Sequence, residues 1–329
     1  MLFGDHHRSA LRGVLLTALL GAALALAACG SDDAAETTAA PAPSASDFPA
    51  PNGRTSEELY ASVTPASDVV VSPTGQVFNE GENRFGFGVF TTGREQITDA
   101  EVAIYAGPPK GPAEGPFPAR VDSLATESQF TAQTTSGDPD AAQAVYVSTL
   151  DLGGKGEWRL VALVREGDTY QSVRIPSIMV GAETKVPQPG DRAPVIHTPT
   201  ADEVGDLDEI DTRDPHDTMH ESDFADVVGE KPIVLVFATP LLCQSRVCGP
   251  VVDIAEQLKA EYGDEVEFIH MEVFEDNSIE KGVRPQVADY NLRTEPWAYV
   301  IDPDGKVSAA IEGAYGPTEL EQAIEKVIG

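Results

Sequence analysis

Hydrophobic and polar residues follow two different patterns along the chain. Between residues 65 and 182 the apolar positions form short runs, many of them alternating with polar residues, and Gly, Pro, Asn and Asp separate the runs. Alternation with a period of two, bounded by turn residues, predicts β-strands. We therefore expect strands at residues 84–90, 102–105, 144–152, 158–164 and 170–175, with the last two forming a hairpin.

The number and spacing of these strands predict an all-β, immunoglobulin-like sandwich domain over residues 63–184. This part of the chain contains neither Cys nor His, which carry much of the chemistry of protein sites. We therefore expect the sandwich to serve as a spacer or as a module that docks a partner.

The pattern changes from residue 185 to the end of the chain at residue 329. Apolar β-rich runs alternate there with amphipathic segments, which predicts an α/β domain. One helix is expected after Cys248, and the capping-box pattern at residues 318–321 predicts the start of another. A tight turn at residues 302–306 predicts a hairpin. The strands expected are residues 233–238, 266–273 and 298–301.

The first residues have the pattern of an export signal. Two arginines precede an apolar run at residues 13–28, as in a signal peptide. The run ends in Leu-Ala-Ala-Cys-Gly, which resembles the lipobox of bacterial lipoproteins and implies that Cys29 carries the lipid. Residues 29–62 are rich in Ala, Ser, Pro and acidic residues, which predicts a disordered tether. We expect a protein anchored by lipid to the extracytoplasmic face of the cell membrane.

Charge narrows the range of partners. Acidic residues outnumber basic ones by 54 to 22, which gives a formal net charge of −32. Such a chain repels phosphate backbones, so we expect no nucleic-acid partner. Once Cys29 is assigned to lipid, two of the three cysteines remain, and outside the cytoplasm such a pair tends to form a disulfide.

The remaining pair, Cys243 and Cys248, has four residues between its members. In a regular helix, Cα atoms five apart would be roughly 8–9 Å distant, whereas a disulfide needs less than about 7 Å. A bridge therefore requires a non-helical segment. Pro250 suits a first helical turn, which places Cys248 or Gly249 at the N-cap, and Arg246 adds positive charge that would favour a thiolate.

These features together resemble the thioredoxin-like superfamily. The resemblance covers residues 187–329 and is greatest to the membrane-anchored thiol-disulfide oxidoreductases related to TlpA and ResA. It is carried by a strand, a loop with both thiols and a helix, and by three short motifs: residues 189–194 (PGDRAP), 229–232 (GEKP) and 294–297 (TEPW).

The resemblance implies a thiol–disulfide exchange enzyme that acts on extracytoplasmic protein thiols and disulfides and receives electrons from a membrane donor. Cys243, Cys248, Pro296 and Arg246 would be its site residues, with Pro296 cis and the backbone of Glu295 pairing with a bound peptide. Family analogy favours Cys243 as the attacking thiol, whereas the position of the helix start favours Cys248. The Cys-x4-Cys spacing departs from the usual Cys-x2-Cys of the family.

Thioredoxins bury a carboxylate behind the thiol pair, but the matching position here is Val236. Glu272 or His270, on the next predicted strand, could substitute for it. Otherwise both are ordinary polar residues of an edge strand.

Three other functions stay open. Pro240, Ser245 and Cys248 approach a peroxiredoxin motif with one residue too many, which favours a peroxidase. A Sco-like role in copper delivery, or zinc binding, would use His216, His220 or His270, although the first two also suit an exposed polar loop. The last alternative is a non-catalytic surface binding module with a structural disulfide. No other cofactor is expected.

Overall fold

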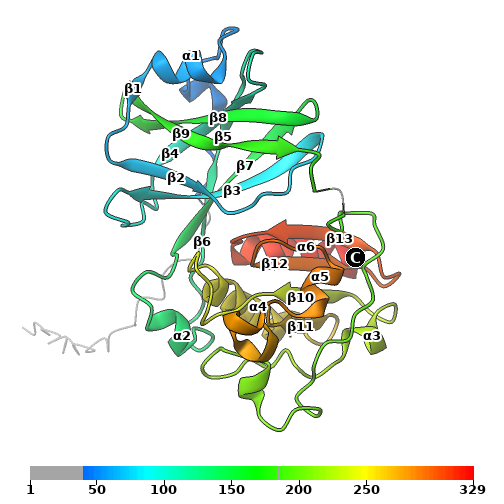
Figure 1. The fold of residues 1–329 in the computed structure, drawn as a ribbon. Coiled ribbons are helices and arrows are strands. Elements are labelled where there is room, and N and C mark those ends of the chain that lie inside the picture. Colours follow the sequence, from blue (N-terminus) through cyan, green and yellow to red (C-terminus); the bar gives the residue numbers. More distant parts are fainter. Residues whose placement is uncertain (1–39, 184) are drawn as a thin grey trace, which may run out of the picture. The chain divides into compact units, whose positions relative to one another are not determined.

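Residues 64–180 form a β-sandwich of two mainly antiparallel sheets in the computed structural model, which describes residues 40–183 and 185–329 (Figure 1). Side chains of the longer strands enter one shared core, where phenylalanines of β3 meet the aliphatic residues of β4, β8 and β9. One sheet has the order β2 (Val69–Pro73), β3 (Gly81–Thr91), β7 (Ala144–Leu152), β6 (Arg120–Ser123). The other has the order β1 (Thr64–Pro65), β9 (Thr169–Val180), β8 (Gly156–Glu166), β4 (Glu101–Gly107), β5 (Glu114–Pro118).

The expected strands and the expected hairpin are present in this sandwich. Strands β8 and β9 pair antiparallel from Glu166 and Thr169 at the turn to Gly156 and Val180 at the far end. Leu160 and Ala162 of β8 enter the sandwich core, as the alternation in the sequence predicts, while Val161 and Leu163 belong to a second buried cluster on the other face of the sheet.

The segment before the sandwich differs from the expected tether. A short 3-10 helix, η1 (Ala45–Asp47), and helix α1 (Ser56–Ala61) are ordered there. Phe48 and Leu59 are buried against Tyr105 and neighbouring residues of β4 and β8. The expectation of disorder up to residue 62 is therefore wrong over residues 45–61, because two well-spaced apolar side chains suffice to dock this polar segment.

The second part of the chain contains a four-stranded sheet of order β11-β10-β12-β13. Strand β10 (Ile233–Phe237) pairs parallel with β11 (Glu267–Met271) and antiparallel with β12 (Trp297–Ile301), and β12 forms the expected hairpin with β13 (Val307–Glu312). All three expected strands are thus present. This strand order, with a helix after β10 and another after β13, is the thioredoxin-like arrangement that the sequence predicts.

Helices cover both faces of this sheet (Figure 1). Val234 and Val236 of β10 point toward α4 (Cys248–Tyr262) and α6 (Pro317–Ile328), while the alternate residues face a second core. That second core includes residues of α3 (Phe224–Val227) and α5 (Pro285–Asp289). Three 3-10 turns complete the elements: η2 (Leu207–Glu209), η3 (Glu275–Asn277) and η4 (Ile279–Lys281).

The sandwich and the thioredoxin-like part share a core. Leu124, Val145 and Val147 of the sandwich belong to the same buried cluster as the residues of α4 and α6. All described residues fall within one compact unit. The change of pattern near residue 184 therefore does not mark a break in packing.

An ion pair between Arg84 of β3 and Glu319 of α6 joins the two parts. The guanidinium donates to both carboxylate oxygens, at 2.6 and 2.7 Å, and to the backbone oxygen of Ala314 at 2.6 Å. The sequence predicts a capping box at residues 318–321, and that prediction is wrong. Helix α6 begins at Pro317 after Gly316 and has no side-chain cap, so Thr318 lies inside the helix.

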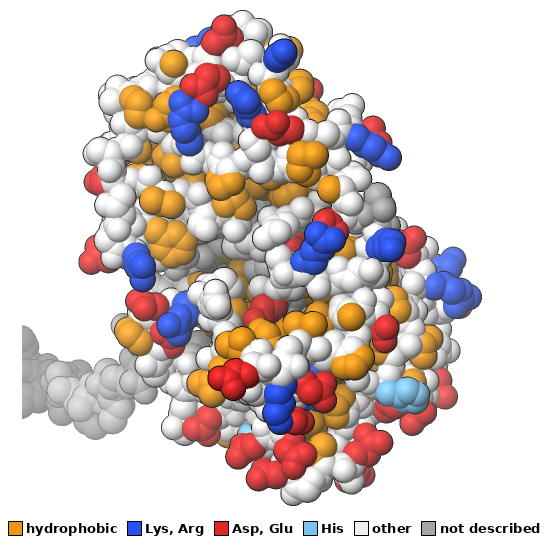
Figure 2. Space-filling model, viewed as in Figure 1, with side chains coloured by type: hydrophobic (Ala, Val, Ile, Leu, Met, Phe, Trp, Pro, Cys, Tyr) orange, Lys and Arg blue, Asp and Glu red, His pale blue; other side chains and the backbone are white. Residues whose placement is uncertain are grey.

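The predicted signal peptide and the predicted lipid-bearing residue, Cys29, lie outside the described residues. In the described part, no helix is long and apolar enough to cross a membrane. Figure 2 shows many acidic side chains on the thioredoxin-like part of the face in view, in keeping with the acidic composition.

Candidate functional site

Cys243 and Cys248 form a disulfide at the carboxyl end of β10. Their Cα atoms are 5.9 Å apart, well within the reach of a bridge. The segment between them is a turn in which Arg246 has a left-handed conformation, with φ of 61°. The expectation that this segment must be non-helical is confirmed.

Helix α4 begins at Cys248 with Val247 as its N-cap, one residue before the expected N-cap if that is Cys248 and two before it if that is Gly249. Pro250 lies in the first turn, as expected. No side-chain cap and no acidic residue occupies this helix start. The backbone N–H groups and the helix dipole therefore favour negative charge at the Cys248 sulfur when the disulfide is open.

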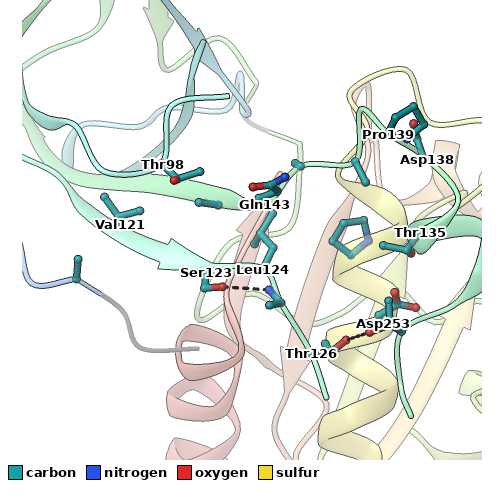
Figure 3. Close-up of a pocket in the computed structure, with 17 residues that line it drawn as sticks. Thr98, Val121, Ser123, Leu124, Thr126, Thr135, Asp138, Pro139, Gln143 and Asp253 are labelled. Carbon is teal, nitrogen blue, oxygen red and sulfur yellow. Dashed lines mark hydrogen bonds between the residues drawn. The ribbon is translucent and has the colours of Figure 1, made fainter. Parts of the chain in front are cut away.

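Residues 124–143, between β6 and β7 of the sandwich and including the short helix α2 (Gln133–Ser136), contact the redox loop and α4. The guanidinium of Arg246 lies 2.8 Å from the carboxylate of Asp138 in this segment, so its charge is balanced there and is not directed at a thiol alone. A cavity of about 670 Å³ lies beside these contacts, with Thr135 and Asp253 among its lining residues (Figure 3).

A buried ion pair between Arg213 and Asp253 of α4 also holds residues 124–143 in place. Nε of Arg213 lies 2.8 Å from the Asp253 carboxylate of α4, and a further guanidinium nitrogen donates to the backbone oxygen of Phe130 at 2.6 Å. The other Asp253 oxygen accepts from the backbone N–H of Ala132 at 3.2 Å. Burial raises the pKa of Asp253 even though Arg213 and other donors oppose the shift.

Pro296 follows a cis peptide bond and is buried, as the resemblance implied. The carboxylate of the preceding residue, Glu295, lies within 4.8 Å of the sulfurs of both Cys243 and Cys248. Burial, and next the negative charge of Glu272, raise the pKa of Glu295 to about 7. A carboxyl group that gains and loses a proton near neutral pH therefore lies beside the disulfide.

Sequence reasoning assigned only the backbone of Glu295 to the site and missed its side chain. The available signal was an acidic residue directly before the proline that the family places beside the cysteines. Glu272 was expected behind the thiols, and it is buried on the chain just after β11. One of its oxygens accepts from Thr212 N–H and Oγ1, both at 2.7 Å, and burial raises its pKa. The negative charge of Glu272 acts on the carboxyl group of Glu295, which is the one that lies within 4.8 Å of the sulfurs.

Ser245, which the peroxidase alternative placed near Cys248, lies by the other cysteine. Its Oγ is 3.2 Å from the sulfur of Cys243. A peroxidase would need this hydroxyl beside the thiolate that attacks peroxide, and the extra residue in the motif shifts it to Cys243.

The histidines considered as metal ligands lie on a buried irregular segment and on β11. His220 is 3% exposed, and its ring centroid is 5.3 Å from that of His270. Asp211 and Asp217 are also buried beside them. The prediction that residues 211–221 form an exposed polar loop is wrong for Asp211, Asp217 and His220, which are buried. Asp214 and Glu221 are exposed, as predicted. His216 is partly exposed and its Nε2 lies 3.1 Å from Asp208.

No protein-family model and no curated protein matches this chain. Solved structures do match it. A Chlorobium tepidum protein described as a candidate thiol:disulfide interchange protein DsbE is 18% identical, covers 44% of this chain and 99% of its own, and has a TM-score of 0.32. A thioredoxin-family thiol:disulfide interchange protein from Chlorobium tepidum TLS is 15% identical, covers 42% and 97%, and has a TM-score of 0.31.

The Lin-41 filamin domain also matches, at 12% identity, with coverage of 36% of this chain and 96% of its own and a TM-score of 0.20. Because identities and TM-scores are this low, the thioredoxin-like assignment depends on the strand order, the redox loop and the cis proline described above.

Proposed function

We propose that this protein carries out thiol–disulfide exchange through Cys243 and Cys248. The observation that carries the proposal is a disulfide between the end of a buried parallel strand and the start of a helix, with the carboxyl group of Glu295 within 4.8 Å of both sulfurs. A thiolate is the attacking species in such exchange, and both the helix start and a nearby proton acceptor increase its population.

In the reducing direction, the thiolate of Cys243 attacks one sulfur of a client disulfide, and the other client sulfur leaves as a thiolate. The thiolate of Cys248 then attacks Cys243 in the mixed disulfide and releases the second client thiolate. Two electrons pass to the client, and the cysteine pair becomes the disulfide. Glu295 accepts the proton that a cysteine thiol must lose before it attacks.

A cavity of about 250 Å³ next to the site provides a place for a client segment. Val247 and Glu295 line it from the thioredoxin-like part, and Phe87 and Phe90 line it from the sandwich. We infer that the sandwich forms one wall of the client site, which gives this domain a role beyond that of a spacer.

The leader at residues 1–28 and the lipobox cysteine, Cys29, support the location of this chemistry at the outer face of the cell membrane. Clients would then be extracytoplasmic proteins, and a membrane protein would supply electrons to the pair. Mass spectrometry of the chain from membranes tests this location, because cleavage before Cys29 and a diacylglycerol adduct on its sulfur are expected.

The proposed redox function is tested by equilibrating the purified chain with dithiothreitol buffers of defined ratio and labelling the resulting thiols. We expect both cysteines to become labelled together as the buffer becomes more reducing, and the reduced protein to reduce an added protein disulfide. A pair that resists reduction until the protein unfolds would show an inert structural bridge and would exclude exchange.

Glu295→Gln should slow exchange by on the order of 100-fold at pH 7.5 if Glu295 is the proton acceptor. The pKa of Glu295 is raised to about 7 with the disulfide closed, so below this pH the group is protonated and cannot accept a proton. The rate of the parent protein should therefore rise with pH through about 7, and the variant should lose this inflection. Initial rates from pH 5.5 to 9 measure both effects.

Glu265→Gln is the matched control. Glu265 is exposed beyond the far end of α4, a helix of 15 residues and therefore about 22 Å long. Replacement of Glu265 should leave the dependence of the exchange rate on pH unchanged. An inflection near pH 7 that persists in Glu295→Gln would remove Glu295 from proton transfer.

A further inference from the structure

Four ligand-type side chains meet in a buried cluster that the proposed exchange reaction does not use. Asp211, Asp217 and His220 come from the segment between η2 and α3, and His270 comes from β11. Each offers one ligand atom, and these atoms all lie within 4.8 Å of one another. All four residues are at most 5% exposed.

His220 gives an independent sign that this cluster accommodates a ligand. Its two ring nitrogens are buried and have no hydrogen-bond partner among the described residues. Nε2 faces the cluster, 3.4 Å from Oδ1 of Asp217 and 3.7 Å from Oδ2 of Asp211. An imidazole buried without any partner is costly, and a bound cation would remove that cost.

The other members are already held in fixed orientations. The carboxylate of Asp211 accepts from the backbone N–H groups of Arg213 and Asp217, at 2.8 and 2.7 Å. Nε2 of His270 contacts the backbone oxygen of Ala238 at 3.0 Å, and Nδ1 lies 2.7 Å from Oδ2 of Asp217. A histidine that donates one ring nitrogen to a backbone carbonyl can bind a metal ion through the other, so Nδ1 and the Asp217 carboxylate would exchange this hydrogen bond for the ion.

We propose that Asp211, Asp217, His220 and His270 bind one zinc-type divalent metal ion. Two carboxylates balance the charge of a dication. Two imidazoles and two carboxylates suit Zn²⁺, whereas Ca²⁺ requires six to eight oxygens and Cu⁺ favours sulfur. At bond lengths of about 2.0–2.1 Å, tetrahedral ligand atoms lie about 3.4 Å apart, close to the separations around His220.

Four protein ligands without an open position indicate a structural site. The ion would hold residues 211–220 against β11, where the backbone of His270 already bonds to Met219 at 3.0 Å. The same segment carries Arg213, which contacts α4, so the metal would also stabilise the support of the redox helix.

The test is zinc binding by the purified full-length chain with its disulfide closed, measured by equilibrium dialysis and elemental analysis. We expect about one zinc ion per chain and a rise in Tm on zinc addition. His220→Ala should weaken binding by on the order of 100-fold or more. His197→Ala is the matched control, because His197 is an exposed histidine that also pairs with an aspartate, Asp223, and it should bind zinc as the parent does.

The double variant Cys243→Ser and Cys248→Ser separates this site from the thiols and should still bind zinc. Cobalt in place of zinc should give a visible spectrum without a sulfur-to-cobalt charge-transfer band. If the parent protein takes up no zinc and its Tm does not change, the cluster is only a buried His–Asp pair and the proposal is overturned. This outcome does not depend on whether His220→Ala folds. Zinc uptake that depends on the cysteines, or that survives in a folded His220→Ala protein, would also overturn the proposal.

Discussion

Cys248→Ser should trap the protein on its client as a mixed disulfide, with turnover reduced by on the order of a thousand-fold or more. Cys248 is fully buried at the start of α4, whereas Cys243 is 5% exposed and precedes the turn. The sulfur of Cys243 is therefore the one that a client can reach first, and Cys248 is placed to resolve the adduct. This geometry favours Cys243 as the attacking thiol, which is one of the two orders of attack that the sequence left open.

The measurement is non-reducing electrophoresis after the reduced variants are mixed with a disulfide-bonded protein such as insulin. Cys243→Ser is the paired variant: it should lose turnover equally but form no stable adduct. Adducts that accumulate on Cys243→Ser and not on Cys248→Ser would reverse the assigned roles. Ser245→Ala keeps both thiols and should still turn over.

Arg213→Met should lower the free energy of unfolding by about 3–5 kcal/mol at pH 7, because it leaves the carboxylate of Asp253 buried without its cation. Arg213 also donates to the backbone oxygens of Phe130 and Pro215, at 2.6 and 2.7 Å, and these acceptors would lose their donors. Denaturant unfolding of the parent and the variant gives the difference directly.

Arg159→Met is the matched control, because it removes an arginine from an exposed pair with Glu157 on the sandwich and should cost about 1 kcal/mol or less. The deficit of Arg213→Met should shrink as the pH falls, since protonation of Asp253 removes the unpaired charge. Burial already raises the pKa of Asp253, so this recovery should begin above the ordinary range for an aspartate. Equal losses of unfolding free energy in the two variants would show that the buried ion pair stabilises the protein no more than the exposed one.

The local pattern of apolar and polar residues is sufficient to predict much of the fold. The run at residues 233–238 is apolar at every position because β10 is covered on both faces, and such a run predicts a central strand. The turn between Cys243 and Cys248 followed from their spacing, and the cis bond before Pro296 followed from the family motif. Each of these features depends on residues that are close in the sequence.

The errors and omissions involve contacts between distant segments. The sequence predicts Leu59 to be part of a tether because it does not show that β8 lies beside this residue. The ion pair of Glu319 is not predicted from the sequence, because its partner, Arg84, lies 235 positions away. In the same way, His220 and His270 are neighbours only because the segment before α3 packs against β11.

The core that Leu124 and Val147 share with α4 and α6 has a consequence for how the chain can be divided. A fragment that starts at residue 185 would expose the apolar surface that these side chains cover, and it would lack residues 124–143 beside the redox helix. A C-terminal half transferred to another protein would lack part of its hydrophobic core. The two domains therefore have to be kept together when the chain is engineered.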